Sequence, residues 1–177
     1  PADLILDDPQ PDPWLGGFAP ALRSADLTIG HLEVPHTTHI AASRDDVPAP
    51  GADPSHLPAL ARAGVGIVTL AGNHIADLGE IGIADTIRGL ARAGIACTGA
   101  GATLSEARKP AIVARSGKRV AVLSYNCVGP ESAWAGPSHA GCSYMRVEPA
   151  DGGPIRPAAA PERIDPASIL AVVRKRL

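Results

Sequence analysis

The amino-acid sequence predicts an α/β fold, and three neighbouring segments support that prediction. Residues 65–70 form an almost continuous apolar run, which is typical of a strand covered on both faces. Residues 79–93 carry apolar side chains three and four positions apart, with charged side chains between them, as an amphipathic helix does. A second apolar run follows at residues 95–98. A strand, a helix and a strand in this order favour a sheet flanked by helices.

The segments before the central run are predicted from their apolar residues and their prolines. In chain order they are a strand at residues 4–6, a turn-rich stretch at 9–17, a short helix at 19–25, a strand from 27 that continues towards 35, and a loop at 36–53. Ser55 is the expected N-cap of a helix over residues 56–63, and Gly64 is expected to end that helix.

The segments after residue 98 are predicted to be shorter elements and loops. In chain order they are a strand-to-helix turn at 99–101, a hairpin of strands 111–114 and 120–125, a long loop at 126–143, and a returning strand at 144–147. Residues 149–164 are rich in Pro, Ala and Gly and are expected to form a loop or linker. Residues 165–177 then begin a helix, with Pro166 at its first position. The predicted domain therefore covers residues 1–148.

Composition and charge limit the classes of function. The chain has 177 residues, enough for one domain, and its 3% aromatic content means that Ala, Val, Ile and Leu build most of the core. A formal net charge of −2 gives no reason to expect nucleic acid or an anionic membrane as a partner. No apolar run approaches the roughly 20 residues that span a bilayer. The chain begins at Pro1, so an upstream signal peptide, the localisation and the oligomeric state all stay open.

The three cysteines are expected to be small apolar fillers rather than chemical groups. Their number is odd, and none lies in a C-x-x-C pair, which argues against a disulfide framework or a thiolate zinc site. Cys127 and Cys142 flank the long loop and could pair, whereas Cys97 has no such neighbour in the sequence.

Polar side chains mark the ends of the predicted strands. Asp3 precedes the first strand, Glu33 follows the second, and Asn73 follows the central apolar run, with His31 and His74 close to them in sequence. Divalent cations favour oxygen and imidazole ligands, so converging strand ends with these side chains are candidates for a metal site. The competing interpretation is an ordinary turn, because Asp and Asn are common turn formers.

Two motifs resemble those of a known family. Residues 25–35, with the sequence A-D-L-T-I-G-H-L-E-V-P, are similar to the A-D-L-x-I-G-N-L-E-x-P segment of CapA-type capsule (poly-gamma-glutamate) synthesis proteins. Residues 71–79 are similar to the A-N-N-H-x-x-D-x-G segment of the same family. The likeness extends over most of residues 1–147 and includes segments 93–96, 99–101, 106–110 and 119–125. Each motif alone is weak, whereas the ordered set is specific.

The resemblance implies a fold, a cofactor and a set of roles. The CapA-type family belongs to the calcineurin-like metallophosphoesterase superfamily, whose domains are α/β sandwiches with a pair of divalent metal ions (Mn, Fe, Zn or Mg) at the strand ends. Carried over by position, Asp3, Glu33 and Asn73 would be metal ligands, and His74 would be the proton donor beside the metals. In the superfamily, a water molecule activated by the metals attacks an ester phosphorus, and the histidine helps the leaving group depart.

Departures from the family pattern limit this expectation. Residue 2 is Ala where the family has Gly, and Ile5 stands where the wider superfamily's D-x-H motif has histidine. His31 replaces the family's usual Asn, although an imidazole can still bind a metal. After His74 the next histidine is His139, which lies in no G-H-x-x-H motif of the kind that supplies the family's later ligands. We therefore expect the incomplete N-terminal half of a metallophosphoesterase-like sandwich, with an incompletely bound metal pair and weak or absent hydrolase activity.

The remaining polar and aromatic candidates are expected to support the site or to be solvated. Asp77 is expected to support its loop or to cap the helix that follows. Trp134 and His139 lie in the long loop, which could border a substrate. Three further histidines are expected to be solvated loop or helix residues, namely His36, His39 and His56.

Three functions from different classes remain. The leading hypothesis is a CapA-like protein of cell-surface polymer biosynthesis with a metal-dependent phosphoesterase-type site, whose substrate is a cell-surface polymer or a phosphoester. The second is a non-catalytic scaffold or binding module in polymer export and assembly. The third is a metal-free nucleotide-binding α/β domain. It is disfavoured because residues 99–101 lack the third glycine and the lysine of phosphate-binding loops.

Overall fold

The computed structural model describes residues 3–39, 51–127 and 130–147 of the chain. The chain divides into two compact units, Pro1–Arg146 and Val147–Leu177, and every helix and strand named below lies in the first. The linker predicted at 149–164 and the helix predicted at 165–177 lie outside the described residues. Within the described ranges, no helix has both the length and the apolar character needed to cross a membrane.

A four-stranded parallel sheet forms the centre of the fold, and it confirms the predicted α/β class. Its strands, in spatial order, are β1 (Asp3–Leu4), β2 (Thr28–Leu32), β3 (Val65–Thr69) and β4 (Ala96–Thr98). All three neighbouring pairs are parallel, so the carboxyl ends of the four strands meet at one edge of the sheet. In open α/β sheets this edge is where ligands bind.

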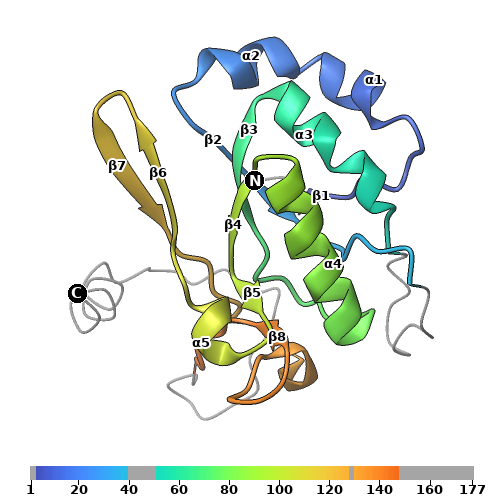
Figure 1. The fold of residues 1–177 in the computed structure, drawn as a ribbon, viewed down its shortest axis with the longest axis vertical. Helices are drawn as coiled ribbons and strands as arrows, with labels where there is room; N and C mark the ends of the chain where they lie inside the picture. Colours follow the sequence, from blue (N-terminus) through green and yellow to red (C-terminus); the bar gives the residue numbers. More distant parts are fainter. Residues whose placement is uncertain (1–2, 40–50, 128–129, 148–177) are drawn as a thin grey trace. The chain divides into compact units, whose positions relative to one another are not determined.

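Helices cover one side of the sheet and one of its ends. They are α1 (Pro11–Gly16), α2 (Ala19–Ser24), α3 (Pro58–Ala63) and α4 (Gly79–Arg92). Figure 1 shows α3 and α4 on one side of the sheet and the hairpin of β6 (Ala111–Arg115) and β7 (Lys118–Val122) on the other. The predictions for α2 and α4 are confirmed. The short helix α1 was predicted to be only a turn-rich stretch, but Pro11 occupies its first turn, where a missing N–H costs nothing.

The start of α3 differs from the prediction. Ser55 does not cap the helix; instead the Asp53 side chain accepts a hydrogen bond from the Ser55 backbone N–H and caps the single 3-10 turn η1 (Pro54–His56). The α-helix begins only at Pro58. Its end is as predicted, because Gly64 adopts a left-handed conformation with φ of 105°.

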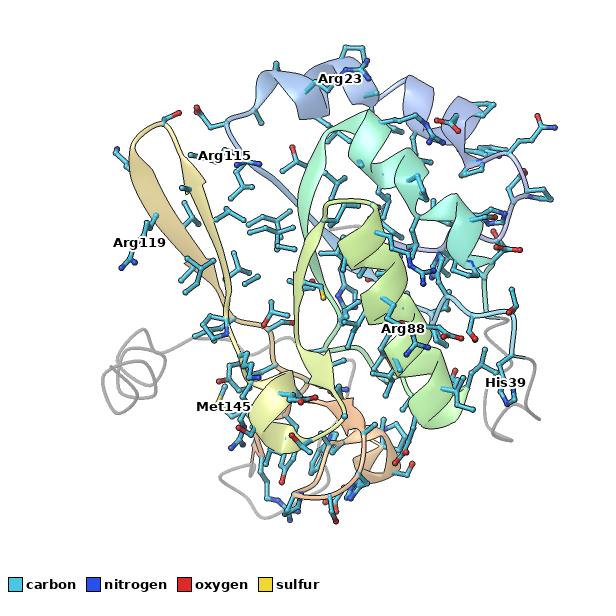
Figure 2. All side chains as sticks on the ribbon, in the orientation of Figure 1. Arg23, His39, Arg88, Arg115, Arg119 and Met145 are labelled. Atoms are coloured by element: carbon cyan, nitrogen blue, oxygen red, sulfur yellow. The ribbon has the colours of Figure 1, made fainter. Side chains whose placement is uncertain are left out.

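The C-terminal part of the unit consists of a hairpin and a short two-stranded sheet. Strands β6 (Ala111–Arg115) and β7 (Lys118–Val122) form the predicted hairpin, with positive φ at both turn residues, Ser116 and Gly117. Arg115 extends from the hairpin towards the central sheet (Figure 2), and its Nη2 atom lies 3.7 Å from where a Cβ of Gly66 would be.

The predicted loop at 126–143 contains structure of its own. It includes a 3-10 turn, η2 (Glu131–Ala133), and a strand, β8 (Gly141–Cys142). Strand β8 pairs antiparallel with β5 (Ala100–Gly101), which leads into the short helix α5 (Leu104–Ala107). The returning strand predicted at 144–147 is reduced to one bridge between Tyr144 and Asn126.

The core is aliphatic, as the composition predicts. Its largest fully buried side chains include Leu32, Ile67, Leu70, Ile75 and Leu90, which come from β2, β3, the turn after β3 and α4. Each such side chain contributes about 1.5–3 kcal/mol through removal of apolar surface from water. Leu32, Leu70 and Ile75 lie at or just beyond the carboxyl ends of β2 and β3, so their burial holds the loops there in place.

The three histidines predicted to be solvated have different surroundings. His39 is exposed, and Figure 2 shows it on the outer side of the structure beyond α4. His56 is half-buried, and its Nδ1 atom lies 2.7 Å from the backbone oxygen of Leu6. His36 is fully buried, so the prediction was wrong for this residue. The loop after β2 carries it into the space beside Thr86 of α4, and its backbone N–H donates to the Thr86 hydroxyl.

Candidate metal centre

Strand register places three polar side chains in one row across the sheet. Asp3 of β1 is the register partner of His31 of β2, and His31 is the partner of Thr69 of β3. Each lies at or near the carboxyl end of its strand. Glu33 follows His31 by two positions, and side chains two positions apart on an extended chain point to the same face. The fold thus brings together residues that are up to 66 positions apart in sequence.

Asp3, His31 and Glu33 form a compact group of potential metal ligands. Each offers one ligand atom, and these atoms all lie within 4.8 Å of one another. Asp3 is exposed, whereas His31 and Glu33 are half-buried. Two carboxylates and one imidazole suit Mn, Fe or Zn, and the carboxylates alone also suit Mg. The donor set therefore fits a divalent cation.

The ring of His31 is held from behind by Thr69. Its Nδ1 atom lies 3.0 Å from the Thr69 hydroxyl oxygen, and that hydroxyl donates to the backbone oxygen of Gly30 at 3.2 Å. Its Nε2 atom faces the other way and lies 3.2 Å from Oε2 of Glu33. One ring nitrogen is thus tied to the sheet, and the other faces the ligand group.

His74 approaches the same carboxylate from the turn after β3. Its Nδ1 atom lies 2.8 Å from Oδ2 of Asp77, and its Nε2 atom lies 4.0 Å from Oε1 of Glu33. All three side chains are largely buried, with 13–16% of each exposed. Glu33 therefore lies between two imidazoles, and each imidazole has a polar partner on its far side.

Gly72 leaves room beside these groups. A Cβ atom at this position would lie 3.1 Å from Nε2 of His31 and 3.6 Å from Oε2 of Glu33. The turn itself is tight, because the backbone N–H of Gly72 bonds the oxygen of Leu70 at 2.8 Å. A side chain here would fill the space that the two ligand atoms face, so glycine keeps that space open.

The structure brings most of the predicted site residues together. The structure brings together Asp3, His31, Glu33 and His74, and it pairs Asp77 with His74. Asn73 is half-buried in the turn between Gly72 and His74, adjacent to the group in sequence. Its predicted role as an amide ligand stays a prediction. The proximity of Asp3, His31, Glu33 and His74 is consistent with their predicted roles as ligands and proton donor, and those roles stay predictions.

Trp134 and His139 contact each other rather than the ligand group. Trp134 is buried and stacks on Tyr144, with ring centroids 4.2 Å apart and planes 7° from parallel. Nε2 of His139 lies 3.1 Å from the Trp134 backbone oxygen. Trp134 packs into the same core as Ile75 of the turn after β3. The expectation that this loop borders a substrate stays a prediction.

Two functional candidates were missed by reasoning from the sequence, namely Thr69 and Gly72. In the sequence, Thr69 is an ordinary residue of a β-strand, and Gly72 has no side chain that would mark it as part of a site. Their roles depend on contacts with β2, more than 30 positions earlier in the chain. Only the pairing of β2 with β3 supplies that information.

A pocket opens beside Asp3. Its volume is about 370 Å³, and its lining includes Asp3, Asp7, Asp8, Trp14 and Leu15. The indole N–H of Trp14 donates to Asp8 at 3.0 Å, although 71% of the Trp14 surface is exposed. Of the ligand group, Asp3 lines this pocket.

Comparison with known proteins gives one family and two curated relatives. Residues 3–175 match the family described as bacterial capsule synthesis protein PGA_cap. Two proteins of Mycobacterium tuberculosis, from strains CDC 1551 / Oshkosh and ATCC 25618 / H37Rv, are each 39% identical to the chain over 85 residues. Both are described as probable polyglutamine synthesis accessory proteins. The alignment covers 46% of the chain and 22% of each relative, so the matched part spans about a fifth of the relatives' length.

Proposed function

This chain belongs to the PGA_cap family of bacterial capsule synthesis proteins, and we propose that it carries part of a metal-dependent phosphoesterase-type centre. The proposed fold is a metallophosphoesterase-like α/β sandwich, of which the described residues form the N-terminal portion. The proposed substrate is a phosphoester linked to the synthesis of a cell-surface polymer such as capsule or poly-gamma-glutamate.

One observation carries the proposal. Glu33 lies between His31 and His74, and both imidazoles direct Nε2 towards its carboxylate. In both rings Nδ1 is occupied by a partner on the far side, which is the arrangement that orients metal-bound and catalytic histidines. An ordinary surface turn does not require two imidazoles around one half-buried carboxylate, each with its Nδ1 atom held by a polar partner.

The residues divide into ligands and a proton-transfer pair. Asp3, His31 and Glu33 would hold a divalent cation, and Asn73 of the adjacent turn would be a further ligand. A cation bound there supplies Lewis-acid polarisation of a phosphoryl oxygen and activation of a water molecule. His31 and Glu33 are half-buried, and partial burial would strengthen their electrostatic interaction with the cation.

His74 is proposed to move a proton, and Asp77 is proposed to hold its ring. Asp77 accepts from Nδ1–H, so Nε2 is the nitrogen that faces the substrate side of the centre. A protonated His74 can donate from Nε2 to the leaving-group oxygen, and the Asp77 carboxylate stabilises the charge on the ring. A substrate entering from the pocket beside Asp3 would reach the ligand group from the exposed side.

Hydrolysis of bis-p-nitrophenyl phosphate with added Mn²⁺ tests the proposal. We expect slow turnover by residues 1–177 that requires Mn²⁺ and falls in His74→Gln, because the described residues supply only one side of a two-metal site. A matched control is His39→Gln, which changes an exposed imidazole outside the centre. Equal rates in the wild type, His74→Gln and Glu33→Gln would contradict the proposal, and rates typical of complete enzymes would contradict the incomplete site.

A non-catalytic scaffold or binding module in polymer export and assembly is the second candidate. It is favoured by the pairing of Glu33 with two histidines, because two imidazolium groups would satisfy the carboxylate without any metal. Stoichiometric metal binding, together with loss of function in Asn73→Ala and His74→Ala, would argue against this candidate.

A further inference from the structure

We propose that Thr69 is a positioning residue of the metal centre: its hydroxyl fixes the tautomer and orientation of the His31 ring, so that Nε2 faces the cation. This inference rests on the proposed function above. It concerns a residue of β3 that makes no contact with the cation itself and that the sequence marks only as part of a buried strand.

The argument begins with the hydrogen atoms available to Thr69. A threonine hydroxyl has one hydrogen to donate and can also accept. That hydrogen is directed at the Gly30 backbone oxygen, 3.2 Å away. We propose that this hydrogen bond to Gly30 is kept, so that in the 3.0 Å contact with Nδ1 of His31 Thr69 accepts and Nδ1–H donates. In that arrangement the neutral His31 ring carries its hydrogen on Nδ1 and none on Nε2.

The position of Nε2 gives this assignment a chemical consequence. Without a hydrogen, Nε2 presents a lone pair to Oε2 of Glu33 at 3.2 Å, and the carboxylate presents lone pairs in return. Two acceptors at this distance repel each other unless something positive lies within reach of both. Asp3 adds a third acceptor to the group, and Gly72 leaves the adjoining space free. A cation shared by these atoms satisfies all of them.

Thr69 is well suited to hold the ring because it is rigid. It lies in β3 at the position paired with His31, so the backbone distance between the two residues is set by the sheet. A β-branched side chain in a strand has few χ1 conformations, which keeps the hydroxyl in place. Threonine thus combines the strand preference of valine with one oxygen directed at the ring.

Thr98 provides a matched control within the same row. It is the register partner of Thr69 on the next strand, β4, so it has the same residue type and the same kind of backbone setting. Its hydroxyl donates to the Lys109 backbone oxygen at 2.7 Å. Removing the Thr98 hydroxyl therefore costs the hydrogen bond to Lys109 without releasing His31.

The test uses residues 1–177 and Zn²⁺ as the probe, with binding measured by competition against a chromophoric chelator. We expect Thr69→Val to bind Zn²⁺ roughly 10- to 100-fold more weakly than the wild type, the usual loss when a partner of a ligand histidine is removed. Thr69→Ser keeps the hydroxyl and should restore most of the affinity. Thr98→Val should bind Zn²⁺ as the wild type does.

NMR of the Zn²⁺-loaded protein gives a second readout besides affinity. With Nε2 on the cation, Nδ1–H of wild-type His31 should exchange slowly with water, because Thr69 accepts its hydrogen bond, and in Thr69→Val it should exchange faster. A role of Thr69 in strand packing alone would leave this exchange unchanged. Fast exchange in the wild type would overturn the proposal even if Thr69→Val does not fold.

The outcomes separate the two proposals. Zn²⁺ binding that is equal in the wild type and folded Thr69→Val would overturn the role of Thr69 and leave the metal centre standing. Fast exchange of the His31 Nδ1–H in the Zn²⁺-loaded wild type would do the same. Absence of Zn²⁺ binding in the wild type would overturn both the metal centre and the positioning role.

Discussion

Two histidines at the end of β2 lie in contrasting environments. His31 is half-buried at the sheet edge, and both of its ring nitrogens have polar neighbours, Thr69 on one side and Glu33 on the other. His36 is five positions further along and fully buried. Its Nδ1 atom lies 3.1 Å from the Val34 backbone oxygen, but its Nε2 atom has no hydrogen-bond partner.

The difference shows what decides the role of a histidine. At His31, carboxylates of Asp3 on β1 and of Glu33, two positions along the chain, lie near the ring, and the three residues form a group of potential metal ligands. At His36, the surroundings remove water and supply no acceptor, so the ring is held neutral. Burial lowers the pKa of His36 from 6.5 to about 4, against the opposing effect of its hydrogen bond to Val34. His31 thus belongs to a group of potential metal ligands, whereas burial keeps the His36 ring in its neutral form.

The largest expected effect concerns the buried ring. The folded-state pKa of His36 is about 4 and the unfolded value is 6.5, so the unfolded chain binds more protons between these pH values. The contribution of His36 is therefore fully present above pH 6.5 and lost as the pH falls towards 4. That loss amounts to roughly 3 kcal/mol. In His36→Gln, the free energy of unfolding should fall less steeply over this range by about that amount.

Urea unfolding at a series of pH values measures the effect. Glutamine retains an amide N–H that can donate to Val34 and does not titrate, so it isolates the buried proton site. His39→Gln is the control because His39 is exposed, and it should retain the wild-type slope. A slope in His36→Gln that matches the wild type would show that His36 is not excluded from protonation and would remove the contrast.

The next effect concerns the open space at the sheet edge. Gly72→Ala places a Cβ atom 3.1 Å from Nε2 of His31 and 3.6 Å from Oε2 of Glu33. We expect Zn²⁺ affinity to fall by roughly tenfold or more, because the ligands must shift to accommodate the methyl group. Gly17→Ala is the control, since nothing lies within 4 Å of its Cβ position. Titration of Gly72→Ala with Zn²⁺ at wild-type affinity would place the cation elsewhere.

The smallest effect on metal affinity is expected at Asp77. Asp77→Asn removes the negative charge behind His74 but leaves Asp3, His31 and Glu33 in place. Zn²⁺ affinity should therefore stay at the wild-type level, while Mn²⁺-dependent hydrolysis of the model phosphodiester should decrease. A parallel measurement on Asp85→Asn, an acidic residue of α4 bonded to Thr37 and Arg88, controls for loss of a carboxylate. A loss of Zn²⁺ affinity in Asp77→Asn would instead make Asp77 part of the ligand group.

Local sequence signals were sufficient for much of the fold. The periodic helix α4, the left-handed Gly64 and the β6–β7 hairpin follow from short-range patterns, and the structure confirms them. The start of α3 and the helix α1 were missed, because a proline-rich segment is compatible with both a turn and a first helical turn. The strand β8 was missed because two residues in a long loop carry no periodicity.

The site was predictable only in part, for a related reason. The ends of the apolar runs and the family resemblance pointed to Asp3, Glu33 and His74, and the fold brings these residues to one edge. Thr69, Gly72 and the burial of His36 depend on which strand pairs with which and on what packs against the loop after β2. Single-sequence patterns do not contain those long-range contacts.

The most direct test of the central claim is a Zn²⁺ titration of residues 1–177 and of Glu33→Gln by isothermal calorimetry. Glutamine keeps the shape of Glu33 and removes the charge that both imidazoles face. The account predicts one bound ion per chain in the wild type and no specific binding in a folded Glu33→Gln. Equal binding by both proteins, or no specific binding by the wild type, would contradict a metal centre built around Glu33.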